Sequence, residues 1–221
     1  MNNKLGIQVD LYVSHDFAMQ SLTGGGTTSD NLKQLRSDSE STKYSYSIGG
    51  RFGFTFPSGM GLKTGFNISK VRRGFSYIEN DGMSMDTFPT PNTTSITNTY
   101  TYVDIPLLFS YEMAGYGPFY YNINAGILFN MTFTAEGKFL EPNGNVANFT
   151  RGAENRYVAY EKEAGASLYA SFGMHYVLNK TFDIILEPNI KYSLGSTTKS
   201  DYPLDEKYTT VGLITGIRYK F

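Results

Sequence analysis

The chain has 221 residues, a formal net charge of −1 and no cysteine. Its length fits one domain, which we place over residues 1–221. The balanced charge argues against a nucleic-acid partner, because such proteins carry a basic patch or stripe. The lack of cysteine excludes disulfides, thiolate zinc sites and cysteine nucleophiles, and we expect no cofactor. Aromatic residues make up 15% and charged residues 18%, which favours a β protein with a large apolar surface.

Eight segments alternate apolar and polar residues with a period of two, the pattern of a β-strand. In the first segment the apolar side chains run from Leu5 to Val13, while Gln8, Asp10 and Ser14 lie on the other face. In every segment the charged residues fall on the face opposite the apolar one. The segments, in chain order, are residues 5–14, 44–56, 62–69, 102–112, 119–133, 166–176, 182–193 and 211–221.

The connections between these segments alternate between short and long. Short turns with suitable turn residues are expected at 57–60, 114–117 and 179–180. The other connections are long and polar, at about 18–43, 79–99, 135–162 and 196–207. The sequence therefore predicts an all-β fold: an eight-stranded antiparallel up-and-down barrel with short turns on one side and long loops on the other.

Alternation by itself fits two kinds of barrel. A soluble lipocalin-like barrel would turn its apolar face inward, and a transmembrane barrel would turn it toward lipid. The polar face here is rich in Gly, Ser, Asn and Thr, which suits a narrow lumen, and aromatic residues gather near the ends of the apolar runs. We therefore predict a transmembrane barrel with periplasmic turns and extracellular loops. The expected periplasmic girdle is Phe54, Phe56, Tyr111, Phe119, Tyr121, Tyr176, Phe182 and Tyr219, and the expected outer girdle is Tyr44, Tyr46, Tyr100, Phe133 and Tyr192.

The C-terminal residues indicate how such a barrel would be assembled. Tyr219 and Phe221 follow Ile217 on one face, and a terminal aromatic after alternating apolar residues is similar to the signal read by the outer-membrane assembly machinery. We predict a location in the bacterial outer membrane, with outer-membrane lipid and that machinery as partners. Because residues 1–4 lack the apolar core of a signal peptide, we interpret the chain as the mature form, with the signal peptide removed and a start Met added.

One strand resembles a recurring strand of a barrel family common in Bacteroidetes, which includes the PorT-like proteins. Its usual form is Tyr-Leu-Glu-Ile-Pro-Leu-Leu, and residues 102–108 here read Tyr-Val-Asp-Ile-Pro-Leu-Leu. Residues 124–127, 186–192 and 218–221 resemble other strands of the same family. The resemblance spans the strands but not the loops. It implies a barrel fold, and some members resemble accessory factors of type IX protein secretion.

Two prolines fall inside predicted strands, Pro106 and Pro188. Proline cannot donate a hydrogen bond to a β-ladder, and in a sheet it marks an edge, an end or a bulge. A closed barrel has no edge. We therefore expect a bulge near Asp104–Pro106 and a similar irregularity at Pro188.

The polar faces predict a network of charged residues inside the barrel. Eight strands enclose a space that side chains just fill, so we expect ion pairs and hydrogen bonds that neutralise one another. A narrow ion path is the alternative. The residues expected in this network are Asp10, Arg51, Lys63, Asp104, Glu112, Glu187, Lys191 and Arg218, with Arg73, Asp183 and Lys220 as further lumen candidates.

The chain has two histidines, and neither has an evident triad partner in the sequence. His15 is expected to face outward and His175 inward, and Ser14 points to the opposite face from His15. We therefore expect no enzymatic, metal-binding or cofactor site. The predicted function is that of a non-enzymatic outer-membrane barrel that presents extracellular loops, including a role as accessory subunit of an envelope or protein-secretion assembly. A small porin-like channel and a lipid-modifying enzyme are the alternatives.

Overall fold

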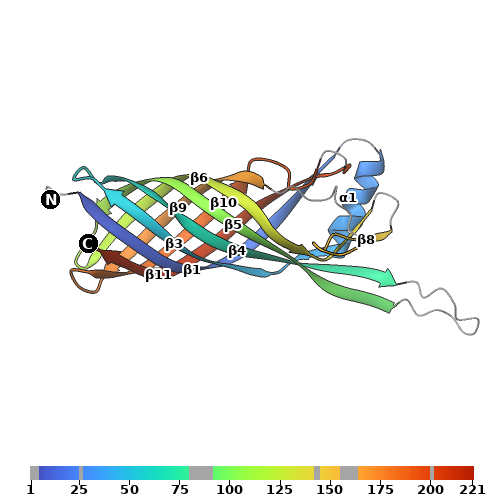
Figure 1. Ribbon diagram of the computed structural model, residues 1–221, viewed down its shortest axis with the longest axis horizontal. Coiled ribbons are helices and arrows are strands. Elements are labelled where there is room, and N and C mark those ends of the chain that lie inside the picture. Colours follow the sequence, from blue (N-terminus) through green and yellow to red (C-terminus); the bar gives the residue numbers. More distant parts are fainter. Residues whose placement is uncertain (1–4, 25–26, 80–91, 142–144, 155–163, 200–201) are drawn as a thin grey trace, which may run out of the picture.

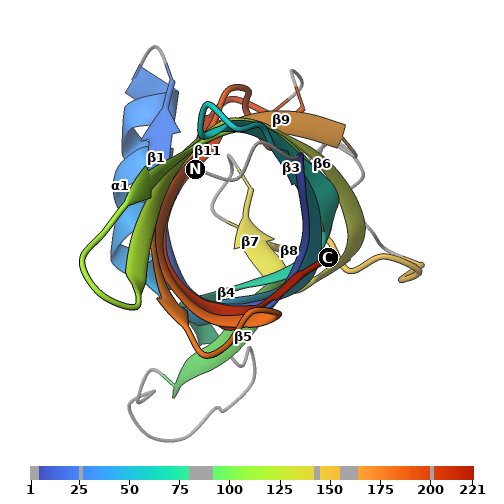
Figure 2. The ribbon, with the colours of Figure 1, turned by 90° about the vertical axis from the view of Figure 1, so that its left-hand side faces the viewer.

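The computed structural model describes residues 5–24, 27–79, 92–141, 145–154, 164–199 and 202–221. Most of this chain forms one antiparallel sheet that closes on itself, as Figures 1 and 2 show. The long strands are β1 (Gly6–Thr23), β3 (Tyr44–Thr55), β4 (Met60–Glu79), β5 (Asn92–Ala114), β6 (Phe119–Glu136), β9 (Ala164–Val177), β10 (Phe182–Ser193) and β11 (Asp205–Lys220). The short elements are α1 (Thr27–Ser39), β2 (Glu40–Thr42), β7 (Lys138–Leu140) and β8 (Val146–Asn148).

The strand order follows the chain around the ring. The sheet runs β2-β4-β3-β1-β11-β10-β9-β6-β5, and β4 also pairs with β5, which closes it. The β1–β11 seam extends from the pair Gln8 and Lys220 to the pair Thr23 and Asp205. The eight long strands match the eight predicted segments, and the three-residue β2 makes the sheet nine-stranded. The all-β antiparallel architecture is therefore confirmed in its main features.

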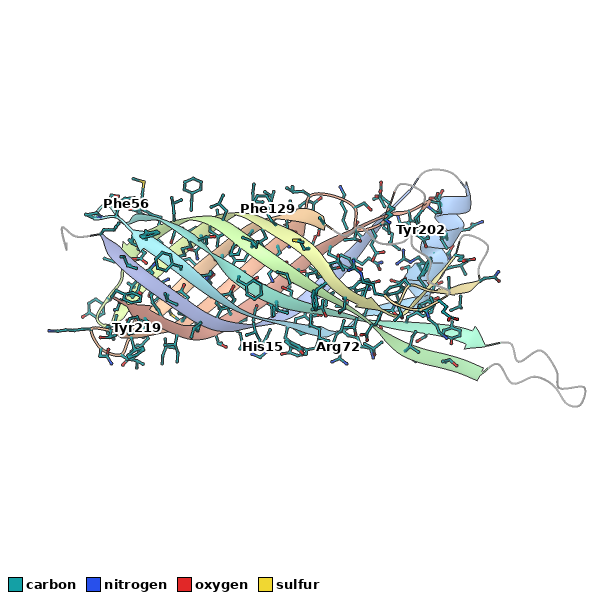
Figure 3. All side chains as sticks on the ribbon, viewed as in Figure 1. His15, Phe56, Arg72, Phe129, Tyr202 and Tyr219 are labelled. Carbon is teal, nitrogen blue, oxygen red and sulfur yellow. The ribbon has the colours of Figure 1, made fainter. Side chains whose placement is uncertain are left out.

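The alternation read from the sequence decides which side chains face in. Along β1, Gln8, Asp10, Tyr12, Ser14 and Asp16 are buried. The apolar residues between them point outward, and Leu11 is 65% exposed. Figure 3 shows Phe56, Phe129 and Tyr219 directed away from the ring. The outer face is thus apolar and the interior polar, the reverse of a soluble barrel.

The short-turn end behaves as predicted. The turn before β4 contains Gly59 with φ of 85°, a conformation that favours glycine over residues with a Cβ. Phe56 N–H donates to the Met60 carbonyl across this turn at 2.7 Å. Both ends of the described chain lie at this end of the barrel (Figure 1). An even number of long strands brings both ends to the same side of the barrel.

The predicted bulge at Asp104–Pro106 is wrong. Between β5 and β6 the register is unbroken there, since Ile105 pairs with Phe129 and Pro106 with Leu128. The bulge falls instead at Thr101 and Tyr102, where β6 has one additional residue, Phe133. This extra residue shifts the alternation along β6, so that the next buried residue is Ala135.

Both prolines are accommodated without an inserted residue. Pro106 has a partner in β6 but none in β4, although the β4–β5 pairing resumes in the same register on both sides of it. Pro188 likewise pairs with Leu213 in β11 and lacks a pair in β9. Each residue of an antiparallel strand directs its backbone N–H toward one neighbour only. The missing proline N–H therefore interrupts one ladder and leaves the other intact.

The predicted long loops are shorter than expected because the strands continue past the apolar band. Residues 92–99, predicted as loop, belong to β5, and β4 extends to Glu79. The predicted connection at 18–43 contains the last residues of β1, followed by α1 and β2. The predicted loop at 135–162 contains the β7–β8 hairpin, and its residues 142–144 and 155–162 lie outside the described part.

These extensions form a folded unit at the long-loop end, which we call the cap. It consists of α1, β2, β7, β8 and the adjoining ends of the long strands. Its buried apolar residues are Leu32, Phe75, Tyr100, Ala135, Phe139, Phe149, Tyr202 and Leu204. Tyr100 was predicted to lie in the outer aromatic girdle, and this is wrong. It is 4% exposed because it shares the inward face of β5 with Asp104.

No helix in the described residues is long and apolar enough to cross a membrane.

Candidate functional site

The lumen near the short-turn end holds a connected set of ion pairs. On β11, Arg218 contacts both oxygens of Asp10 at 2.7 and 3.1 Å, and also reaches Glu112 at 2.8 Å. On β3, Arg51 binds Glu187 through both terminal nitrogens at 2.7 and 2.8 Å and lies 3.5 Å from Asp10. Both arginine side chains are buried. Asp10 thus links two ion pairs into one network.

Two of these contacts join strands that are not neighbours in the sheet. Arg51 lies on β3 and Glu187 on β10, with β1 and β11 between them. Arg218 on β11 reaches Glu112 on β5, across the ring. Such contacts can form only through the lumen. They place charged groups of opposite sign in contact across the lumen.

Neutral groups add further hydrogen bonds to this network. The Glu187 carboxylate accepts bonds from the Tyr169 hydroxyl at 2.8 Å and the Ser171 hydroxyl at 2.7 Å. Lys63 is buried and donates to the Asn124 side-chain oxygen at 2.8 Å. At the short-turn end, Lys220 binds Asp183 at 2.7 Å. Satisfied polar groups of this kind are the condition for a stable buried network.

Apolar side chains narrow the lumen in its middle. Tyr12, Ile185 and Ile214 form one buried cluster there. A second cluster consists of Leu108, Leu128 and Tyr169. The sequence analysis did not identify these residues, because a single apolar residue on a polar face interrupts the alternation only locally. The signal that could have identified two of them is that Ile185 and Leu108 are apolar residues on the polar face of their strands.

Two predicted lumen residues lie nearer the long-loop end, apart from the Arg218 network. Lys191 pairs with Asp16 at 3.4 Å, and Asp16 also accepts bonds from Ser14 and Ser47. Asp104 is 2% exposed. The structure thus distributes the predicted set over two levels of the lumen. The level toward the short-turn end contains Asp10, Arg51, Lys63, Glu112, Glu187 and Arg218. The level toward the long-loop end contains Asp104 and Lys191.

Asp104 is held by neutral donors alone. Its Oδ2 accepts from Asn67 at 2.9 Å and from Ser69 at 2.6 Å, and its Oδ1 accepts from Asn130 at 2.6 Å. Asn130 in turn accepts from the Ser167 hydroxyl at 2.8 Å. In the described chain no lysine, arginine or histidine pairs with this carboxylate. It is the acid of the predicted network that has no counter-ion.

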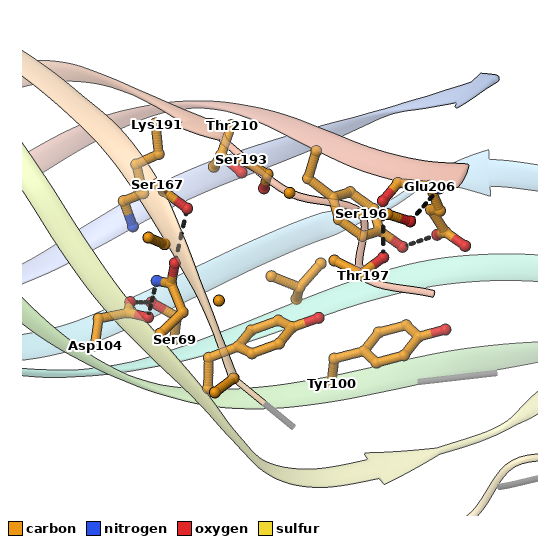
Figure 4. A pocket seen from close by; sticks show the side chains of 18 of the residues that line it. Ser69, Tyr100, Asp104, Ser167, Lys191, Ser193, Ser196, Thr197, Glu206 and Thr210 are labelled. Atoms are coloured by element: carbon orange, nitrogen blue, oxygen red, sulfur yellow. Dashed lines mark hydrogen bonds between the residues drawn. The ribbon is translucent and has the colours of Figure 1, made fainter. Parts of the chain in front are cut away.

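A cavity of about 190 Å³ lies on the long-loop side of Asp104, between the lumen and the cap (Figure 4). Asp104 and Lys191 line it on the lumen side. Tyr100, Tyr102 and Tyr208 line it on the cap side. The sequence alone did not predict this cavity, because Tyr100 was predicted to lie in the outer girdle and Tyr208 fell outside the predicted strands.

The cap has its own ion-pair network. Arg36 of α1 is fully buried and contacts Glu40 at 2.6 Å and Glu206 at 3.0 Å, and the Tyr208 hydroxyl also donates to Glu206. Burial alone would raise the pKa of Glu206, but Arg36 and the Tyr208 hydroxyl outweigh it and hold that pKa below its usual value. Burial and the Glu206 charge raise the pKa of Tyr208 well above its usual value. The cap network therefore favours the charged form of Glu206.

The two histidines lie on opposite faces of the wall, as predicted. His15 is exposed on the outside, and its Nδ1 lies 2.6 Å from the Tyr44 hydroxyl. The neighbouring Ser14 is buried inside and bonds to Asp16. His175 is buried in the lumen, stacked on Tyr120 with ring centroids 4.6 Å apart. Within the described residues, no three His, Asp or Glu side chains are grouped in a way that could hold a metal ion.

The structure resembles solved bacterial outer-membrane barrels. Neisserial surface protein A aligns with a TM-score of 0.52 and 13% identity over 98% of this chain and 97% of that one. OprG of Pseudomonas aeruginosa gives 0.47 and 12%, over 98% and 95%. The protease OmpT of Escherichia coli gives 0.43 and 10%, over 98% and 97%. No family model and no curated protein sequence matches this chain.

At these identities the likeness concerns the fold alone, and of these three structures Neisserial surface protein A has a TM-score above 0.5. The fold is that of an outer-membrane β-barrel. Together with the apolar outer face, it bears out the predicted location in the bacterial outer membrane.

Proposed function

We propose that the eight long strands span the outer membrane, that the lumen is closed to solutes, and that the protein acts through its extracellular cap. In this proposal it is a non-enzymatic interaction protein, with the role of an accessory subunit in an envelope or protein-secretion assembly. The observation that carries it is the crossing of the lumen by the buried pair Arg51–Glu187 and the partly buried pair Arg218–Glu112. A protein whose lumen is filled offers its outer surfaces for function.

The cap supports this proposal because ion pairs and a packed apolar cluster hold its surface in place. A salt-bridge network anchors α1 through Arg36, and the apolar cluster around Phe139 and Phe149 packs beneath it. Binding residues are commonly placed on segments that a rigid scaffold holds in position. The resemblance of residues 102–108 to the PorT-like strand favours the same role, as part of a secretion assembly.

No arrangement in the described residues favours the enzymatic alternative. The exposed His15 contacts Tyr44, and the adjacent Ser14 points into the lumen. A serine on the far side of the wall cannot receive assistance from this histidine. We therefore propose that neither histidine acts in lipid modification, and unchanged lipids in cells that overproduce the protein are the expected result.

Two measurements test the proposal. In planar bilayers the purified barrel should give no stepwise conductance, whereas reproducible channel steps would overturn the closed lumen. Affinity purification from native membranes in mild detergent, followed by mass spectrometry, should recover a stoichiometric envelope protein. The comparison variant is Phe149→Ala, which should loosen the cap while the barrel stays folded. The envelope protein should no longer be recovered with this variant. Recovery of no partner by either protein would contradict the interaction role.

A further inference from the structure

The cavity beneath the cap combines two features that the proposed function does not use. One is the buried carboxylate of Asp104, and the other is a wall of tyrosine rings (Figure 4). The cavity holds about 190 Å³. For comparison, a buried apolar cavity of about 150 Å³ can hold benzene. The space therefore suits a molecule with one ring or a short alkyl chain.

The charges around the cavity leave one carboxylate without a cation. Three acidic residues line it, namely Asp16, Asp104 and Glu206. Asp16 pairs with Lys191 at 3.4 Å, and Glu206 pairs with Arg36 at 3.0 Å. Asp104 receives three hydrogen bonds from neutral groups and pairs with no basic side chain in the described part of the chain.

Asp104 also retains room for one more donor. A carboxylate offers about four lone-pair sites, and Asn67, Ser69 and Asn130 occupy three of them. Oδ1 takes only the bond from Asn130. The three neutral donors fix the carboxylate in orientation without neutralising it. A buried charge of this kind is stabilised when an opposite charge reaches it.

The part of β5 next to Asp104 is suited to a cation with an apolar body, since Tyr100 and Tyr102 share the inward face of that strand with the carboxylate. Tyr100 and Tyr102 lie nearly parallel, with ring centroids 6.3 Å apart and planes 8° from parallel. The face of a tyrosine ring attracts a cation electrostatically. Val71, Ala164 and Ala166 add apolar surface to the same cavity. Carboxylate, ring faces and apolar surface together match a protonated amine that carries a small hydrocarbon group.

We propose that this cavity is a binding site for a small organic ammonium ion, with its charged nitrogen at Asp104 and its apolar part against Tyr100 and Tyr102. The site is separate from the closed lumen and from the outer surface of the cap. It therefore stands or falls independently of the interaction role proposed above.

The test uses benzylammonium as the probe and the full chain in a non-ionic detergent, with binding measured by isothermal titration calorimetry. Benzyl alcohol has nearly the same shape without the charge, and benzoate has the opposite charge. We expect benzylammonium to bind about tenfold or more tightly than benzyl alcohol, since charge-assisted bonds are about twice as strong as neutral ones. Benzoate should show no binding.

Two variants locate the site. Asp104→Asn should weaken benzylammonium binding by about tenfold or more and leave benzyl alcohol unaffected. The matched control is Asp183→Asn, a buried acid at the other end of the lumen that pairs with Lys220, and it should leave binding unchanged. Tyr102→Leu serves as a second variant at the cavity if Asp104→Asn does not fold, and it should also weaken binding.

Three results would overturn the proposal. The first is equal affinity of the wild-type protein for benzylammonium and benzyl alcohol, which includes no binding of either. The second is unchanged binding in folded Asp104→Asn, or in Tyr102→Leu where that variant replaces it. The third is tighter binding of benzoate, which would indicate that Lys191 recruits an anion instead. Binding to an unrelated detergent-solubilised barrel would identify partition into the micelle.

Discussion

Arg218 Nη1 on β11 lies 2.8 Å from Glu112 Oε1 on β5, although these strands stand on opposite sides of the ring. The same guanidinium holds Asp10 on the neighbouring strand β1 with two further bonds. One side chain therefore connects both halves of the barrel wall through its interior. The wall is held from inside as well as by its ladders.

Replacing Arg218 by methionine should destabilise the barrel strongly. The variant would keep much of the side-chain volume but leave Asp10 and Glu112 without their main cation. Removing one partner of a buried ion pair costs about 3–5 kcal/mol. Urea unfolding in detergent, followed by the change in gel mobility between the folded and heated forms, measures the loss.

The control for this experiment is Lys180→Met, which removes a cation from an exposed turn at the same end of the barrel. It should change the free energy of unfolding by less than about 0.5 kcal/mol. Equal effects of the two substitutions would show that the lumen network does not stabilise the barrel. Arg218→Lys should lie between them, because lysine keeps the charge but not the planar fork.

The cap should lose order as the pH falls. The pKa of Glu206 is held below its usual value of about 4.3. A carboxylate with a lowered pKa contributes its stabilisation above the usual value, and the contribution disappears as the pH falls through the lowered one. A spin label on Lys33→Cys, in a chain without other cysteines, should report ordered α1 at pH 7 and greater mobility near pH 3.

Glu206→Gln is the control for the pH experiment. It cannot ionise, so the mobility of the label should be raised already at pH 7 and should vary less between the two pH values. A wild-type spectrum that stays constant down to pH 3 would contradict the role given to the Arg36–Glu206 pair. So would a Glu206→Gln protein that retains the full pH response.

The cap was not predicted, because the sequence gives little sign of the features that form it. The polar composition of residues 27–39 concealed α1, whose buried side chains in the described part are Ser29, Leu32 and Arg36. Helix patterns are recognised by a wide apolar stripe, and this helix buries a charged residue instead. Phe139 lies in the three-residue strand β7, and Phe149 directly follows the three-residue β8, so both strands are too short for alternation to be recognised.

Phe149→Ala should loosen the cap and leave the barrel intact. Phe149 is fully buried and stacks on Tyr100 with ring centroids 5.2 Å apart. Losing a buried phenylalanine costs about 3–5 kcal/mol, and here the loss falls on a unit outside the apolar band. Protease treatment of intact cells should cleave the variant faster within the cap, while its heat-dependent gel mobility stays normal.

Phe133→Ala is the matched control, because this phenylalanine is 69% exposed on the outer wall. It should show wild-type resistance to protease. The interpretation of the cap as a packed unit would be wrong if both variants were cleaved at the same rate. It would also be wrong if Phe149→Ala unfolded the barrel as a whole.

Phe221→Ser should reduce the amount of protein that reaches the outer membrane without lowering the stability of what arrives. Phe221 is 76% exposed and contacts Tyr219 with ring centroids 4.7 Å apart, so little buried surface is lost. The predicted role of these two residues is in assembly. Membrane fractionation measures the yield, and urea unfolding measures the stability. Tyr116→Ser, at a 94% exposed aromatic of a short turn, should change neither.

The barrel itself was largely predictable because one physical rule governs every strand. A residue between lipid and lumen must suit one of two environments, and residues such as Leu11 and Asp10 identify them. The rule no longer applies where the strands extend beyond the apolar band of the barrel. There Tyr100 turned inward, and Phe133 introduced a bulge that no alternation predicts. The cavity is lined partly from this region, and its tyrosines could be placed only by the folded chain.

The seam between β1 and β11 has a consequence for the order of folding. It pairs Gln8 with Lys220 and is the pairing that spans most of the described chain. Closing so long a loop of chain has a higher entropic cost than forming any of the hairpins between successive strands. We therefore expect the hairpins to form early and the seam last. Until then the sheet has two open edges, and the lumen carboxylates of Asp10 on β1 have no access to Arg218. The final folding step joins the backbone ladder and the interior charge network together.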